Sequence, residues 1–241
     1  MALPTQAVML ACSRGRASMW LPPHFHAAFA RVFGLRVSYE GVPLQGRGVV
    51  HLSNHLSYLD VQALGRVLRT RFVAKEDVRG WPVFGLLSRL QQTVFISRQR
   101  HRAGAVGDAL VLALAGEHGL LLFPEGTTSD GSTVLPFKSS VFAPLLAVPG
   151  LRLQPVRIEL LSVDGEAIAN GGDRDRYAYH GDATLVPHLW RFLRGSGAEL
   201  RVRFLEPITV APDADRKALA REACAAVTGV ESTAEAGLPP A

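Results

Sequence analysis

Short apolar runs alternate with amphipathic segments along most of the chain. The apolar runs are typical of buried or half-buried strands, which we expect at residues 35–40, 48–53, 72–74, 93–96, 120–123, 153–160 and 200–205. Helical periodicity predicts helices between them, at residues 60–69, 83–91, 104–117, 137–147 and 184–194. This alternation predicts a single α/β domain, with a largely parallel sheet flanked by helices.

The first expected helix differs from the others in its apolar stripe, formed by Leu21, Phe25, Phe29 and Val32. His26 is expected to fall largely outside the stripe. Two interpretations stay open: a helix docked on the core, or a helix lying in the plane of a membrane surface.

The chain divides by this pattern into three expected parts. Residues 1–34 form the N-terminal segment with the amphipathic helix, and residues 35–210 form the α/β domain. Residues 211–241 form an alanine-rich helix, expected up to about Val227, and a tail.

Composition narrows the class of protein. The 241 residues carry a net charge of +5, which suggests an anionic partner such as lipid, a phosphate-bearing substrate or nucleic acid. No apolar run reaches the roughly 18–20 residues of a membrane span. The two cysteines, Cys12 and Cys224, show no disulfide or metal spacing and favour a reducing compartment.

Ser53-Asn-His-Leu-Ser-Tyr-Leu-Asp60 is the strongest local signal. His55 and Asp60 can meet only if His55 lies in a turn after a strand and Asp60 begins the next helix. The carboxylate would then hold one imidazole nitrogen and leave the other free to take a proton. Alternatively, Ser57 and Asp60 form a variant of the capping box. His51, four residues before His55, lacks a third ligand, so we expect no metal.

Phe123-Pro-Glu-Gly-Thr-Thr-Ser129 follows an expected buried strand, at the strand end where open α/β sheets bind ligands. Glu125 can accept hydrogen bonds from substrate hydroxyls, and Gly126 allows close backbone approach. The alternative is an ordinary polar turn in which a hydroxyl, such as that of Thr127, acts as a cap.

Positive charge is concentrated between residues 66 and 102, where nine basic and two acidic residues give a net +7, which leaves −2 for the rest of the chain. This pattern fits a phosphate or anionic-lipid site, or a solvated face. We expect this stretch to lack the interleaved exposed aromatic residues that single-stranded nucleic-acid binding favours, and therefore expect no nucleic-acid partner.

Four segments together resemble the ordered motifs of the glycerolipid acyltransferases, the family of bacterial 1-acylglycerol-3-phosphate acyltransferases. They are Asn54-His-Leu-Ser-Tyr-Leu-Asp60, Phe95-Ile-Ser-Arg98, Phe123-Pro-Glu-Gly-Thr-Thr-Ser129 and Leu153-Gln-Pro-Val156. Lys75 and Trp81-Pro-Val-Phe-Gly85 also resemble the family's segment between its first two motifs.

The resemblance implies transfer of an acyl group from acyl-CoA or acyl carrier protein to a lysolipid hydroxyl, without a cofactor. His55 would be the base and Asp60 its orienting partner. The substrate-binding residues would be Arg98, Glu125, Gly126, Thr127, Lys75 and Pro155. The expected location is the cytoplasmic face of the membrane, as a peripheral or monotopic protein that contacts anionic lipid.

The acceptor is expected to be 1-acylglycerol-3-phosphate, but two features favour a lyso-ornithine lipid instead. Ser97 precedes Arg98 where phosphatidate-forming members often carry Asp, and residues 179–190 are similar to members that include lyso-ornithine-lipid acyltransferases. A non-catalytic lipid-binding protein and a hydrolase are competing hypotheses, although no Gly-x-Ser-x-Gly elbow is present to support a serine esterase.

Overall fold

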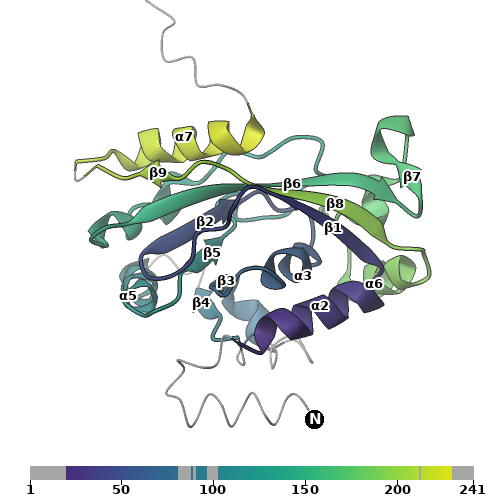
Figure 1. The fold of residues 1–241 in the computed structure, drawn as a ribbon, viewed down its shortest axis with the longest axis horizontal. Helices are drawn as coiled ribbons and strands as arrows, with labels where there is room; N and C mark the ends of the chain where they lie inside the picture. Colours follow the sequence, from purple (N-terminus) through teal and green to yellow (C-terminus); the bar gives the residue numbers. More distant parts are fainter. Residues whose placement is uncertain (1–19, 81–87, 89–90, 97–102, 212, 230–241) are drawn as a thin grey trace, which may run out of the picture.

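In the computed structural model, residues 20–80, 88, 91–96, 103–211 and 213–229 are described. A nine-stranded sheet forms the centre of the molecule, with helices on both faces (Figure 1). The strands are β1 (Leu35–Glu40), β2 (Val49–Ser53), β3 (Arg71–Lys75), β4 (Val94–Ile96), β5 (Leu120–Leu122), β6 (Arg152–Val163), β7 (Glu166–Ala167), β8 (Ala198–Phe204) and β9 (Ile208–Thr209). The α-helices are α2 (Pro22–Val32), α3 (Asp60–Gly65), α5 (Ala103–Leu114), α6 (Leu185–Leu193) and α7 (Arg216–Thr228).

The main strand order is β1-β8-β6-β2-β5-β3-β4, and the five strands from β6 to β4 are mutually parallel. β8 runs antiparallel to β6, and β1 pairs in parallel with β8. The expected largely parallel sheet is therefore confirmed, with one reversed edge. In such a sheet the carboxyl ends of β2, β5, β3 and β4 lie along one edge, so segments distant in sequence are brought together there.

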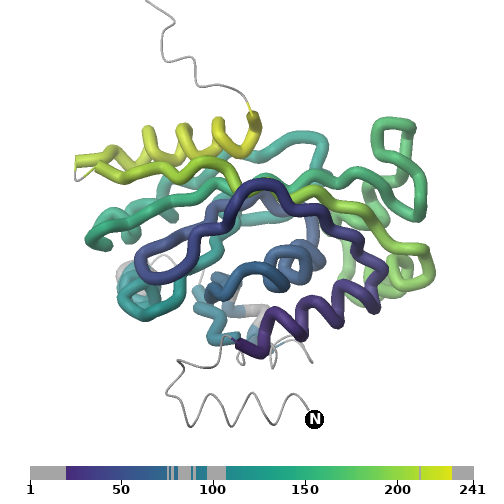
Figure 2. Tube along the Cα trace, viewed as in Figure 1, coloured from purple at the N-terminus to yellow at the C-terminus, as the bar shows by residue number. Residues whose placement is uncertain are grey.

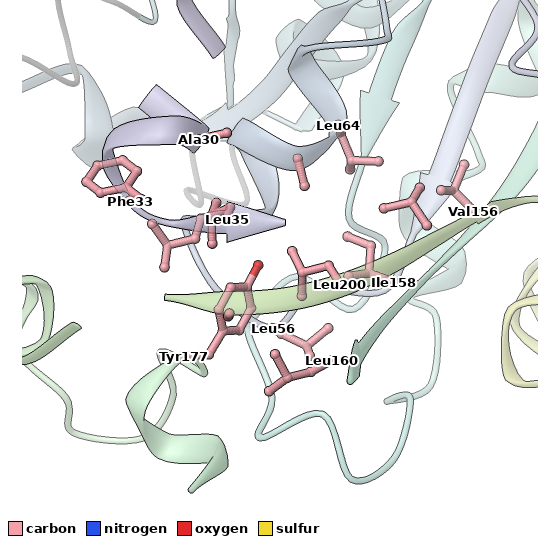
Figure 3. Packing of buried hydrophobic residues seen from close by; sticks show 14 of the residues in the cluster. Ala30, Phe33, Leu35, Leu56, Leu64, Val156, Ile158, Leu160, Tyr177 and Leu200 are labelled. Atoms are coloured by element: carbon pink, nitrogen blue, oxygen red, sulfur yellow. The ribbon is translucent and has the colours of Figure 1, made fainter. Parts of the chain in front are cut away.

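Two hydrophobic clusters fill the two sides of the sheet. One combines α2, α3, Tyr177 and side chains of β6 and β8, and Figure 3 shows part of it. The other combines α5, α7 and the opposite face of β2, β5 and β6. The chain trace in Figure 2 shows α7 and α2 on opposite sides of the sheet. Both terminal helices thus pack on the sheet of the central segment.

The apolar face of α2 differs from the expected stripe. His26 is buried with Pro22 and Ala30 on the core side, whereas Val32 is 73% exposed. His26 hydrogen-bonds to the side chains of Gln62 (2.9 Å) and Gln91 (2.7 Å), which satisfies both ring nitrogens. A histidine with two polar partners can be buried like an apolar residue, which residue type alone did not reveal.

The prediction of a helix at residues 137–147 is wrong. Two short 3₁₀ turns, Ser139–Val141 and Leu145–Ala147, occupy this segment. Pro144 explains the break, since proline lacks an N–H and its ring clashes with the preceding helical turn. The helix expected at 83–91 lies largely outside the described residues. Within the part of the chain that is described, no helix is long and apolar enough to cross a bilayer.

Candidate active site

The turn after β2 carries His55 and is fixed to β6 by the side chain of Asn54. Its amide nitrogen donates to the carbonyl of Ile158 (2.9 Å), and its amide oxygen accepts the N–H of Ile158 (2.7 Å). The side chain thereby extends the β2–β6 pairing by one position after the strand ends at Ser53. Asn54 is buried, so it positions the turn instead of contacting solvent.

His55 and Asp60 meet across this turn. The distance from His55 Nδ1 to Asp60 Oδ2 is 2.8 Å, and Asp60 is the first residue of α3. Asp60 is fully buried, whereas the His55 side chain is 19% exposed. The proton on Nδ1 is thus held by the carboxylate, and none of the hydrogen bonds between described residues involves Nε2. This is the arrangement a general base requires.

Asp60 also holds the backbone of the turn. Its Oδ2 accepts the N–H of Leu56 (2.7 Å) and of Ser57 (2.9 Å) as well as the His55 ring. The Ser57 hydroxyl has no partner among the described residues, so the hydroxyl half of a capping box is absent there. Orienting the imidazole and anchoring the turn are therefore simultaneous roles of one carboxylate.

Tyr177 is a residue that the sequence did not single out. Its hydroxyl donates to Asp60 Oδ1 at 2.7 Å, from 117 positions further along the chain. Tyr177 is fully buried, and burial together with the Asp60 charge raises its pKa well above the ordinary value. The phenol therefore stays a hydrogen-bond donor, and both oxygens of Asp60 have donors. No local motif marked this residue.

The His55 ring stacks on the ring of Phe123, with centroids 3.8 Å apart and an interplanar angle of 12°. Phe123 follows β5, which pairs directly with β2. The stacking and the Asp60 contact together restrict rotation of the imidazole. A base held in one orientation loses less entropy in the reaction.

Glu125 lies beneath the same turn and is 2% exposed. Its Oε1 accepts the N–H of His55 (2.8 Å), and its Oε2 accepts the N–H of Leu135 (3.2 Å). Burial raises the pKa of Glu125 to about 7, and these two hydrogen bonds offset that rise only in part. The structure thus gives Glu125 a positioning contact to His55, while its contact with substrate hydroxyls stays a prediction.

Gly126 and Thr127 follow Glu125 at the surface of this edge. Gly126 has φ +68°, and a β-carbon there would meet the side chain of Lys138, with Nζ 2.5 Å away. Glycine is required by this left-handed backbone. Thr127 is exposed, so its side chain is accessible to a substrate. Substrate binding by both residues stays a prediction.

Two further predicted residues, Lys75 and Pro155, lie on the same sheet. Lys75 ends β3 and pairs in register with Ile96 of β4. Pro155 is buried in β6, where its carbonyl accepts the N–H of Leu205 at 3.0 Å. Proline has no N–H to donate. At this position the pairing with β8 has already stopped, and a sheet tolerates a missing donor there. Arg98 lies outside the described residues, so its role stays a prediction.

Three residues of the 177–188 segment, Tyr177, Tyr179 and His188, contact the turn between His55 and Asp60. The N–H of Tyr179 donates to the carbonyl of Leu56 (2.8 Å), and the Thr128 hydroxyl donates to the carbonyl of Tyr179. His188 Nε2 lies 3.1 Å from the Ala178 carbonyl and Nδ1 lies 3.0 Å from the Tyr58 hydroxyl. The ring therefore donates from Nε2 and accepts at Nδ1. This segment connects the first and third motifs.

Comparisons with known proteins agree with this geometry. A sequence profile of the family described as Acyltransferase matches residues 35–159. The chain is 40% identical over 212 residues to the lyso-ornithine lipid O-acyltransferase of Brucella abortus, covering 83% of this chain and 78% of that protein. It is 32% identical over 208 residues to the 1-acyl-sn-glycerol-3-phosphate acyltransferase of Neisseria meningitidis, covering 86% and 77%.

The fold also resembles a solved structure. The crystal structure of the 1-acyl-sn-glycerophosphate acyltransferase PlsC from Thermotoga maritima has a TM-score of 0.69, at 20% sequence identity, over 98% of this chain and 89% of that one. At this identity the likeness concerns the fold alone. The profile match and the curated relatives establish that the chain belongs to the glycerolipid acyltransferase family and is an O-acyltransferase.

Proposed function

We propose that the protein transfers an acyl group from an acyl thioester to the hydroxyl of a lyso-ornithine lipid. The hydrogen-bonded His55–Asp60 pair supports the chemistry, since a base of this kind needs no protein nucleophile when the substrate supplies the hydroxyl.

In the proposed reaction His55 Nε2 removes the proton as the substrate oxygen attacks the thioester carbonyl. The tetrahedral intermediate then collapses, the carbon–sulfur bond breaks, and the imidazolium returns the proton to the leaving thiolate. Asp60 stabilises the imidazolium between these two steps. A general base typically contributes about 10²- to 10⁴-fold in rate.

The choice of acceptor reverses the expectation of 1-acylglycerol-3-phosphate. The Brucella abortus relative and a Rhizobium meliloti protein, 39% identical over 84% of this chain, are both named lyso-ornithine lipid O-acyltransferases. The Neisseria glycerophosphate enzyme is less similar, at 32%. Tyr179 and His188, which lie in the stretch similar to lyso-ornithine-lipid enzymes, adjoin the catalytic turn and are therefore placed to contact an acceptor.

An acceptor competition assay tests this proposal. Purified protein is given labelled acyl-CoA or acyl carrier protein thioester with lyso-ornithine lipid, with 1-acylglycerol-3-phosphate, or with both. We expect a higher kcat/KM for the lyso-ornithine lipid with at least one donor. Preference for the phosphate acceptor would refute the proposed substrate and identify 1-acylglycerol-3-phosphate in its place.

His55→Ala serves as the control for mechanism in the same assay. It should lower kcat by at least about 10²-fold while circular dichroism stays unchanged. Normal turnover by a folded His55→Ala protein would refute the proposed base. We further propose that the enzyme works peripherally at the cytoplasmic membrane surface, where a lysolipid acceptor is found.

A further inference from the structure

The outer face of α6 exposes a set of large apolar side chains. Val186 is 74%, Trp190 64% and Leu193 42% exposed, and their spacing of four and three places them on one side of the helix. Seven large apolar side chains are exposed among the described residues, and three of them lie on this nine-residue helix. A concentration of exposed apolar side chains of this kind is typical of a surface that binds a membrane or another protein.

Charge on the same helix favours an anionic occupant. Arg191 and the adjoining Arg194 are exposed, and the Arg194 guanidinium lies 6.0 Å from the centre of the Trp190 ring. The sequence Leu185–Leu193 contains no acidic residue. Tryptophan beside arginine is the combination found where a helix lies between lipid headgroups and acyl chains.

The inner face of α6 touches the catalytic turn. His188 is bound to the Tyr58 hydroxyl at 3.0 Å, and the Phe192 ring lies 6.0 Å from the ring of Tyr177, which itself donates to Asp60. A surface that docks through the outer face of α6 would therefore lie next to the active site. The end of α2 lies near the segment that follows α6. The N–H of Ala198 donates to the carbonyl of Gly34, and Gly34 is two residues after the exposed Val32.

We infer that α6 is the membrane-docking element of this enzyme, with Val186, Trp190 and Leu193 inserted shallowly into an anionic bilayer surface and Arg191 and Arg194 at the headgroups. Nine residues span only about 14 Å, so the helix lies in the plane of the membrane instead of crossing it. This inference rests on the proposed lysolipid acceptor, which reaches the active site from the same bilayer. It assigns docking to a different helix from the α2 stripe, whose Phe25 and Phe29 are half-buried.

Vesicle co-sedimentation of the full chain tests the inference, with phosphatidylcholine vesicles that contain or lack phosphatidylglycerol. The Val186→Ser/Trp190→Ser variant should partition at least about tenfold more weakly into both kinds of vesicle, since it loses apolar insertion. Arg191→Gln/Arg194→Gln should partition into anionic vesicles about fivefold more weakly for each arginine removed. Its partitioning into vesicles without phosphatidylglycerol should stay unchanged.

The matched control is Val42→Ser/Leu112→Ser, which removes two apolar side chains that are at least as exposed (80% and 76%) from a loop and from α5. It should bind vesicles like the wild type. All variants should keep the wild-type circular dichroism and turn over a short-chain, water-soluble lyso acceptor at the wild-type rate, because the changed side chains lie on the outer face of α6 or away from the site.

Three results would overturn the inference: absence of wild-type binding to anionic vesicles at low salt, equal binding by a folded Val186→Ser/Trp190→Ser variant, or a dimer in solution that this variant dissociates. The last result would make the face a contact between two copies of the chain. Failure of the acceptor assay leaves the vesicle measurement interpretable, so the two proposals can fail separately.

Discussion

At the scale of single residues, the site is organised around the carboxylate of Asp60. Its two oxygens accept hydrogen bonds from the His55 ring, two backbone N–H groups and the Tyr177 hydroxyl. A carboxylate only accepts; Oδ2 has three of these donors and Oδ1 has one, so both oxygens are held. Fixing Asp60 in this way fixes the imidazole that it holds.

Tyr177→Phe should lower kcat by about tenfold and leave the KM for both substrates unchanged. The variant keeps the ring in the core and removes one hydrogen bond to a charged group, worth about 1.5–3 kcal/mol. Steady-state kinetics give the split between kcat and KM. In an Asp60→Asn background the same change should have little further effect, because Tyr177 acts through Asp60.

Tyr39→Phe is the matched control, since its hydroxyl donates to the backbone carbonyl of Ala63 at 2.7 Å, away from Asp60. It should leave kcat unchanged. Equal losses of kcat in the two tyrosine variants, or full additivity with Asp60→Asn, would count against a positioning role for Tyr177.

Glu125 predicts a specific dependence of stability on pH. Its pKa is about 7 in the folded protein and near 4.5 when unperturbed, because burial disfavours the charged form. Between these values the unfolded chain has released the proton that the folded chain retains. The stabilising contribution of the neutral carboxyl is therefore complete below about pH 4.5 and is lost as the pH rises through about 7.

Urea denaturation at pH 5 and pH 8 measures this effect. The free energy of unfolding of the wild type should fall relative to that of Glu125→Gln as the pH rises, since glutamine does not titrate. A constant difference between the two proteins across this range would show that Glu125 is not protonated in the folded state.

At the scale of secondary structure elements, the β2–α3 connection depends on pairing that continues past the end of a strand. The side-chain amide of Asn54 takes the place of a neighbouring strand's backbone: it hydrogen-bonds to both the N–H and the carbonyl of Ile158. A buried backbone group without a partner costs about 1–3 kcal/mol.

Asn54→Ala should therefore lower the free energy of unfolding by about 2–4 kcal/mol, since it leaves two buried groups unpaired. Ser38→Ala is the control, because Ser38 is exposed on the edge strand β1 and its hydroxyl makes one long contact of 3.3 Å with Leu200. It should change stability by no more than about 0.5 kcal/mol. Similar values for the two variants in urea denaturation would refute the role given to Asn54.

At the scale of the whole molecule, α2 docks onto α3 because one residue is small. A β-carbon on Gly65 would overlap the ring of His26, which is buried between the two helices. The close approach lets His26 reach Gln62 and Gln91.

Gly65→Ala should destabilise the protein by about 1–3 kcal/mol, the usual cost of overpacking. In a His26→Ala background the same change should be neutral or slightly stabilising, because alanine favours the helix and the obstacle is gone. Gly80→Ala is the control, since a β-carbon at Gly80 would meet nothing within 4 Å and its φ is not left-handed. Thermal denaturation of the four proteins completes the cycle, and additive effects would disprove the contact.

The sequence by itself determined most of the elements and the pairing of His55 with Asp60. Apolar periodicity located the strands, including Leu35–Glu40 at its observed bounds, because a strand's pattern reflects which face is buried. The separation of His55 from Asp60 required a strand-to-turn-to-helix path, and this path is present. These are local properties, set by residues close together in the chain.

Only the tertiary structure decided which distant residues complete the site. Tyr177 reaches Asp60 across 117 positions, and Asn54 reaches Ile158 across 104. Nothing near these residues in sequence indicates their partners, since long-range contacts depend on strand order and on the reversed direction of β8. The same holds for His26 and for the two faces of α6. Whether an apolar or polar side chain is buried depends on what packs against it, and residue type alone does not specify this.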